Sequence, residues 1–160
     1  MTTEIRVLAV ASGGGHWIQL FRLRPAWDGC AVTYVTTNVG YRDEVMRDAA
    51  ERGQPAPVLL AIVDASRWQK LRLIRLLFQL LICFIRVRPH RVITTGAAPG
   101  FFAILFGRLF GARSVWVDSI ANTDELSESG QRAGPLADYW LTQWEHLARP
   151  DGAEYLGKVV

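Results

Sequence analysis

The fold is decided by the stretch IRVLAVASGGGH, residues 5–16. Its first part, residues 5–11, is a short run of apolar and β-branched residues that ends in three glycines and a histidine. This pattern is typical of a buried strand that turns tightly into a helix. The apolar run is too short for a signal peptide, so we expect a first β-strand here and a chain that is not secreted.

Strand and helix patterns alternate along the rest of the chain. Further strands are predicted at residues 31–36, 57–63, 91–94, 114–117 and 138–142. Helices are predicted from Trp17 to near Pro25 and over residues 41–52, 67–88 and 101–110. Alternating strands and helices form βαβ units, which require a parallel sheet with right-handed crossovers. We therefore predict an α/β fold with a single Rossmann-like, doubly wound parallel sheet, forming one domain over residues 1–160.

The composition fits one globular domain. Of the 160 residues, 50% are hydrophobic and 21% are charged, and the formal net charge is +3, which excludes intrinsic disorder for most of the chain. The two cysteines, Cys30 and Cys83, exclude a disulfide scaffold and the usual four-ligand zinc cluster. We expect a reducing compartment and no metal.

Charge is distributed unevenly along the chain. Residues 67–91 hold seven basic side chains and no acidic one, whereas residues 118–154 hold eight acidic and two basic side chains. The basic block surrounds an apolar run, residues 76–85, that is interrupted by Gln79 and is too short to span a membrane. A basic and apolar helix suits an anionic membrane surface better than a nucleic acid. The alternative is a long core helix with a solvated basic rim.

The side chains expected to contact the membrane lie on this helix or open it. They are Trp68, Lys70, Arg72, Arg75, Phe78, Leu81, Ile82 and Ile85. Trp68 stands where an interfacial aromatic residue would sit. We expect peripheral or monotopic attachment to a membrane and no nucleic-acid partner.

Three loops should form the ligand site, because parallel sheets bind ligands at the carboxyl ends of their strands. These loops are residues 12–16, 94–100 and 118–123. Glycines let the backbone approach an anion, and a helix N-terminus supplies free N–H groups, so a phosphate or diphosphate is the natural ligand. The alternative is a tight turn without a ligand. The dinucleotide fingerprint fails, because Ile18 stands where its third glycine belongs, so we expect no cofactor.

Two side chains in these loops are candidates for acid–base chemistry. His16 could hydrogen-bond a diphosphate or transfer a proton, or it could be a local cap or packing residue. Asp118 follows the fifth predicted strand and could be a base for a hydroxyl acceptor or the N-cap of the segment after it. The amides of the loop TTGAAPG, residues 94–100, could line an anion or sugar site, or form a plain turn with Pro99 at a helix start.

Five motifs occur in a fixed order. They are SGGGHWIQL after the first strand, TTNVGYR after the second, TTGAAPG after the fourth, and VWVDSIAN and PLADYWLTQWEHL near the end. As a series they resemble the PssD-type bacterial exopolysaccharide proteins, which are similar to the membrane-anchoring subunit of the eukaryotic bipartite UDP-GlcNAc transferase of dolichol-linked oligosaccharide assembly. That family is the N-terminal, acceptor half of a GT-B glycosyltransferase, similar to MurG but divided between two polypeptides.

The resemblance implies roles for individual residues. His16 and Asp118 would be catalytic, although the family commonly has Glu-Ser where this chain has Asp118-Ser119. The residues that would bind the acceptor or its phosphates are Ser12, Gly13, Gly14, Gly15, Thr95, Gly96, Gly100 and Ser119. The polar run DELSESGQRAG, residues 124–134, departs from the family pattern and is assigned no role.

The resemblance also implies a reaction and partners. The chain would be the membrane-associated subunit of a split glycosyltransferase that moves GlcNAc or another hexose from a UDP donor to an isoprenoid-diphosphate-linked saccharide. Its partners would be a donor-binding subunit that carries most of the UDP-sugar site, the lipid of the cytoplasmic membrane face, and the lipid-linked acceptor. One alternative is a non-catalytic anchor that recruits the catalytic subunit. Another is a soluble nucleotide-binding enzyme with an atypical loop.

Overall fold

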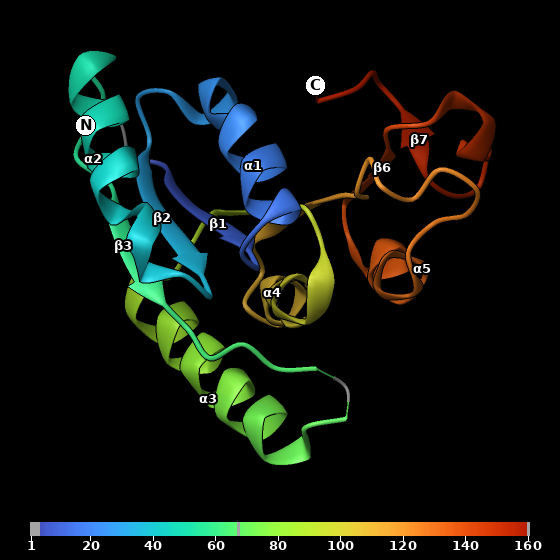
Figure 1. Cartoon of the computed structure of the whole chain (residues 1–160), viewed down its shortest axis with the longest axis horizontal. Helices are drawn as coiled ribbons and strands as arrows, with labels where there is room; N and C mark the ends of the chain where they lie inside the picture. Colours follow the sequence, from blue (N-terminus) through green and yellow to red (C-terminus); the bar gives the residue numbers. More distant parts are fainter. Residues whose placement is uncertain (1–3, 67, 160) are drawn as a thin grey trace.

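Seven parallel strands form one sheet in the computed structural model, which describes residues 4–66 and 68–159 (Figure 1). Their order is β3-β2-β1-β4-β5-β6-β7. The strands are β1 (Arg6–Ala11), β2 (Ala31–Thr36), β3 (Val58–Ala61), β4 (Arg91–Thr94), β5 (Arg113–Val117), β6 (Tyr139–Thr142) and β7 (Glu154–Tyr155). The order of connection reverses between β1 and β4, which is the switch point where such sheets bind ligands. The predicted doubly wound parallel sheet is confirmed.

Helices cover both faces of this sheet (Figure 1). The α-helices are α1 (Gly15–Arg22), α2 (Arg42–Glu51), α3 (Lys70–Val87), α4 (Ala97–Leu109) and α5 (Glu128–Ala133). Short 3-10 turns occur at η1 (Arg24–Trp27), η2 (Val39–Tyr41), η3 (Gly134–Leu136) and η4 (Glu145–Leu147). The helices α1 and α2 lie on one face, and α3, α4 and α5 lie on the other.

The alternation of side chains along β1 divides the core in two. Leu8 and Val10 point to one face and join the cluster under α3 and α4, which includes Leu80 and Phe84. Val7, Ala9 and Ala11 point to the other face and join the cluster under α1, which includes Trp17, Leu20 and Tyr34. A strand buried on both faces needs apolar residues at every buried position, which explains the continuous apolar run of β1 from Val7 to Ala11.

A distant arginine caps the end of α3. Arg88 adopts a left-handed φ of 47° and is followed by Pro89, which cannot continue the helix. The side chain of Arg6 donates from Nε to the carbonyl oxygen of Val87 at 2.8 Å and from Nη2 to that of Arg88 at 2.8 Å. A cation at this end binds carbonyls that the helix leaves unpaired and offsets the negative end of its dipole.

The structure corrects several predicted boundaries. The helix α4 begins at Ala97 rather than at residue 101, because the first turn of a helix needs no N–H donors and therefore tolerates Pro99. The helix α3 begins at Lys70, so Trp68 precedes it, and Arg67 lies outside the described residues. The strand β3 is shorter than predicted, and the short elements α5 and β7 were not predicted.

Neither a spanning helix nor a metal cluster is found in the part of the chain that the structure describes. No helix within residues 4–66 and 68–159 is both long enough and apolar enough to cross a membrane. No group of three or more His, Cys, Asp or Glu side chains in the same ranges could hold a metal ion. Cys30 and Cys83 are free thiols.

Candidate functional site

The loops that follow β1 and β4 are joined by a reciprocal pair of hydrogen bonds. Nδ1 of His16 lies 2.8 Å from the carbonyl oxygen of Thr95, and Oγ1 of Thr95 donates to the carbonyl oxygen of His16 at 2.7 Å. His16 is the second residue of α1, and Thr95 directly follows β4. The two loops therefore meet at the switch point of the sheet, between the N-termini of α1 and α4.

This contact determines the tautomer of His16. A carbonyl oxygen accepts hydrogen bonds and donates none, so Nδ1 must carry a proton. In the neutral ring, Nε2 is then the nitrogen that can accept a proton or a hydrogen bond. The side chain of His16 is half-buried, which is compatible with contact to a ligand.

The amides of Gly13 and Gly14 are already engaged by the protein. Gly13 N donates to Oγ1 of Thr37 at 2.9 Å, and Gly14 N donates to the hydroxyl of Tyr41 at 3.0 Å. The Tyr41 ring stacks on Trp17, with ring centroids 4.6 Å apart. These contacts hold the glycine-rich loop against the loop after β2. The amides that remain able to bind an anion are therefore the first ones of α1, from Gly15 onward. A helix leaves these amides without intrahelical acceptors.

The start of α4 depends on two glycines for different reasons. Gly96 has a φ of 123°, and a Cβ placed on it would lie 3.0 Å from Cε1 of His16. Gly96 therefore leaves room for the imidazole ring. A Cβ on Gly100 would overlap Oγ1 of Thr94, so this buried glycine lets α4 pack closely on β4. Gly96 shapes the candidate site, whereas Gly100 is a packing residue that lies beneath it.

The carboxylate of Asp118 is buried and accepts four hydrogen bonds. Its Oδ1 accepts from Nδ2 of Asn122 at 2.6 Å and from the amide of Ser127 at 3.2 Å. Its Oδ2 accepts from Oγ of Ser127 at 2.9 Å and from Nε1 of Trp116 at 3.2 Å. A Cβ on Gly130 would overlap Oδ2, so α5 also packs against this carboxylate. Asp118, with 1% of its surface exposed, thus anchors the loop between β5 and α5.

The alternative that Asp118 is the N-cap of the next helix is wrong. The N-cap of α5 is Ser127, whose Oγ accepts from the amide of Gly130 at 2.9 Å. Asp118 supports this cap indirectly, because its Oδ2 accepts a hydrogen bond from the Ser127 hydroxyl. The polar run at residues 124–134, which was assigned no role, therefore supplies a partner of the carboxylate.

Ser119 is also occupied inside the protein. Its Oγ accepts from Nε2 of Gln19 at 3.2 Å and from the amide of Ala121 at 3.3 Å, and the residue is buried. Gln19 and its partner Gln143 are buried polar residues that the sequence reasoning missed. They stand inside the motifs SGGGHWIQL and PLADYWLTQWEHL, but a glutamine in a motif carries no signal of the contacts it makes. Ser12, half-buried, opens the glycine-rich loop.

The resolved pKa shifts lie away from these loops. Burial raises the pKa of the Tyr34 phenol in the core under α1. Burial likewise raises the pKa of the Cys83 thiol in the core under α3. Both groups are packing residues, so these shifts give no reason to place chemistry there.

An exposed apolar stripe runs along α3, on the side that faces away from the sheet. It consists of Leu71, Ile74, Phe78, Ile82 and Ile85. The spacing of three or four residues places these side chains on one side of the helix. Of the predicted membrane contacts, Phe78, Ile82 and Ile85 lie on the stripe, whereas Leu81 packs against the core. Lys70, Arg72, Arg75 and Trp68 are exposed near its N-terminal end.

The fold is that of a Rossmann-like domain, and it is similar to about half of MurG and of other UDP-sugar enzymes. MurG from Acinetobacter baumannii superposes with a TM-score of 0.70 and 13% identity over 94% of this chain and 45% of that one. A UDP-N-acetylglucosamine 2-epimerase from Neisseria meningitidis superposes with a TM-score of 0.61 and 12% identity over 87% of this chain and 40% of that one. The chain thus spans less than half the length of these structures, and the likeness shows the fold alone.

The sequence is homologous to a subunit of a UDP-N-acetylglucosamine transferase. It is 29% identical to the UDP-N-acetylglucosamine transferase subunit ALG14 of Eremothecium gossypii, over 96% of this chain and 80% of that protein. It is 34% identical to the subunit of the same name from Yarrowia lipolytica, over 46% of this chain and 37% of that protein. No family model matches the chain.

Proposed function

We propose that this chain is the acceptor-side, membrane-associated subunit of a UDP-GlcNAc-dependent glycosyltransferase whose donor-binding half is a second polypeptide. The observation that carries the proposal is the homology to a named transferase subunit along almost the whole chain. The fold supports it, because the chain matches one half of a two-domain enzyme. The acceptor is an isoprenoid-diphosphate-linked saccharide at the cytoplasmic face of a membrane.

In this proposal His16 has the central chemical role, and its contact with Thr95 supports that assignment. An acceptor hydroxyl attacks the anomeric carbon of the donor sugar, a glycosidic bond forms, the bond from sugar to diphosphate breaks, and UDP leaves. The hydroxyl proton passes to Nε2 of His16, whose Nδ1 proton is held by Thr95. The N-termini of α1 and α4, which meet beside His16, attract the acceptor diphosphate. Asp118 positions the neighbouring loop and is not the base, because protein donors occupy both of its oxygens.

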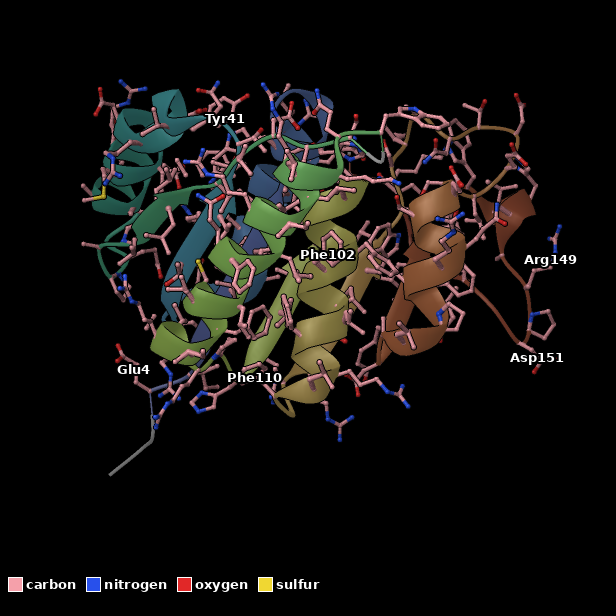
Figure 2. All side chains as sticks on the ribbon, turned by 90° about the horizontal axis from the view of Figure 1, so that it is seen from below. Glu4, Tyr41, Phe102, Phe110, Arg149 and Asp151 are labelled. Carbon is pink, nitrogen blue, oxygen red and sulfur yellow. The ribbon has the colours of Figure 1, made fainter. Side chains whose placement is uncertain are left out.

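A pocket next to the start of α4 has an apolar side and a polar side, and we place the lipid end of the acceptor against the apolar side. It measures about 200 Å³ and lies between α3, α4 and α5, which lie side by side in Figure 2. Leu73, Phe101 and Phe102 form its apolar side, and Ala98, two residues after Gly96, brings it next to the start of α4. Its polar side comes from α5, through Glu128, Ser129 and Arg132. The pocket supports an approach of the acceptor from the exposed apolar stripe of α3 toward His16.

The second candidate function is a non-catalytic anchor for the donor-binding subunit. The buried and fully engaged carboxylate of Asp118 favours this alternative, since it leaves His16 as the remaining predicted catalytic side chain. One experiment distinguishes the two functions. Loss of the His16 imidazole slows transfer if the chain takes part in the reaction, and leaves transfer unchanged if the chain is an anchor.

Membrane attachment through α3 is testable with two substitutions. We expect Ile74→Asp combined with Phe78→Asp to weaken binding to vesicles that contain anionic lipid by at least about tenfold. Each buried large apolar side chain contributes roughly 1.5–3 kcal/mol, and each nearby basic residue adds about 1 kcal/mol. Vesicle flotation of the full-length protein measures the effect.

The matched control for this experiment is Met46→Asp. Met46 is an exposed apolar residue on α2, which covers the opposite face of the sheet. Its replacement should leave vesicle binding unchanged. Equal binding by the double variant and the unsubstituted protein would exclude α3 as the contact surface, as would an equal loss in Met46→Asp.

A further inference from the structure

Two buried glutamines have all but one of their hydrogen-bonding positions filled by the protein. The Gln19 amide donates to the carbonyl oxygen of Gly15 at 3.1 Å and accepts from the amide of Ile120 at 2.9 Å. The Gln143 amide donates to Oε1 of Gln19 at 2.6 Å and to the carbonyl oxygen of Asp118 at 2.9 Å. Gln143 is 1% exposed and Gln19 is 6% exposed, so water does not replace these contacts.

The C-terminal segment completes this arrangement. Oε1 of Gln143 accepts from the backbone amide of Val159 at 2.8 Å. The same segment is held by Lys158, whose Nζ lies 4.1 Å from the centre of the Trp144 ring. Figure 1 shows the C-terminal segment returning toward α1. A continuous path of hydrogen bonds, buried at its centre, therefore joins Val159 to Gly15 through two side chains.

Each amide in this path has one permitted orientation. The backbone N–H groups of Ile120 and Val159 can only donate, and the carbonyl oxygens of Gly15 and Asp118 can only accept. If the Val159 amide leaves, Oε1 of Gln143 loses this hydrogen-bond donor, at a cost in free energy. Rotation of the Gln143 amide to relieve that cost breaks its 2.6 Å bond to Gln19. Gln19 then keeps its bonds to Gly15, Ser119 and Ile120 but loses one of the two donors to its Oε1, so the side chain that contacts Gly15 is held less firmly.

We propose that Gln143 and Gln19 are positioning residues that couple the seating of the C-terminal segment, residues 156–159, to the conformation of the glycine-rich loop beside His16. The loop takes its ligand-binding arrangement when the segment is seated. The kinetic consequence rests on the proposed function, whereas the structural coupling does not. A protein that binds at the C-terminal edge thereby adjusts the acceptor site without touching it.

The test removes one hydrogen-bond donor, the backbone N–H of residue 159. Val159→Pro eliminates the N–H that bonds to Gln143, and Val159→Ala is the matched control that keeps it. We expect hydrogen exchange of the amides in residues 12–18 of the full chain to become about tenfold faster in Val159→Pro and to stay unchanged in Val159→Ala. A tenfold change in exchange rate corresponds to about 1.4 kcal/mol, which lies within the range of interaction energies found between contacting residues.

A double-mutant cycle distinguishes a coupling between Gln143 and Val159 from a general loss of stability. Gln143→Leu alone should accelerate the same amides as Val159→Pro, and the double variant should show no further acceleration. In the two-chain enzyme, Val159→Pro should raise KM for the lipid-linked acceptor about tenfold and leave KM for the UDP-sugar unchanged. If Gln143→Leu does not fold, the comparison of Val159→Pro with Val159→Ala still tests the coupling.

Three results would overturn the coupling. They are unchanged exchange in Val159→Pro, equal effects in Val159→Ala, and additive effects in the double variant. Coupled exchange together with a selective change in acceptor KM supports the coupling in full. Coupled exchange in a protein that transfers no sugar with any partner supports the coupling and contradicts the proposed function.

Discussion

We expect His16→Ala to slow sugar transfer in the two-chain enzyme by about a hundredfold or more, the scale of lost general acid–base help. The same change should cost stability only about 1 kcal/mol, because one hydrogen bond to Thr95 is lost, which lowers the melting temperature by roughly 2–4 °C. The measurement is the transfer rate at saturating donor, taken beside a thermal melt. A large loss of rate with a small loss of stability assigns chemistry to the imidazole.

Two further substitutions separate the two ring nitrogens of His16. Asparagine places a donor near the position of Nδ1, so His16→Asn should keep the contact with Thr95 and restore stability without restoring the rate. Glutamine places its amide near the position of Nε2, so His16→Gln tests whether a polar group without proton transfer is enough. Full activity in His16→Asn would show that the residue merely joins the two loops, and would favour the anchor function.

The second large effect should follow from Asp118→Asn. We expect this variant to lose about 3 kcal/mol of stability and to melt roughly 10 °C lower. The four donors around the carboxylate come from Asn122, Ser127 and Trp116, so an asparagine amide must point its own N–H groups at one pair of them. Two buried donors then have no acceptor, and a charge-assisted network becomes a neutral one.

The control for this prediction is Asp124→Asn. Asp124 is exposed in the same loop, so the same chemical change should leave the melting temperature nearly unaltered. Thermal denaturation of both variants, followed by circular dichroism, gives the comparison. A stable Asp118→Asn that transfers no sugar would contradict the structural role and would return Asp118 to the catalytic base predicted from the sequence.

The sheet could be predicted from the sequence because its strands carry strong local signals. The run before the glycines is buried on both faces from residue 7 to residue 11 and is apolar there, and the stretches that follow are rich in β-branched residues. The start of α4 was missed for a local reason. Pro99 and two small residues resemble a turn, and the left-handed φ of Ala97 that begins the helix has no signature in the sequence.

The site could be predicted less completely, because its polar contacts join residues far apart in the chain. His16 was found from its place after the glycines, but its bond to Thr95 joins residues 79 apart in sequence. Gln19 and Gln143 are 124 residues apart, and no periodic pattern relates them. Asp118 was predicted to be either a base or a cap, and the second alternative is wrong because the cap of α5 is Ser127.

The most direct test of the central claim is a transfer assay with separated chains. The purified chain, a donor-binding partner and their mixture are each given labelled UDP-GlcNAc and an isoprenoid-diphosphate-linked saccharide in detergent micelles. One Rossmann-like domain lacks the opposing wall of a two-domain cleft, so we predict no transfer by either chain alone and transfer by the mixture. Transfer by this chain alone, or equal transfer by the partner without it, would contradict the claim that the two chains share one active site.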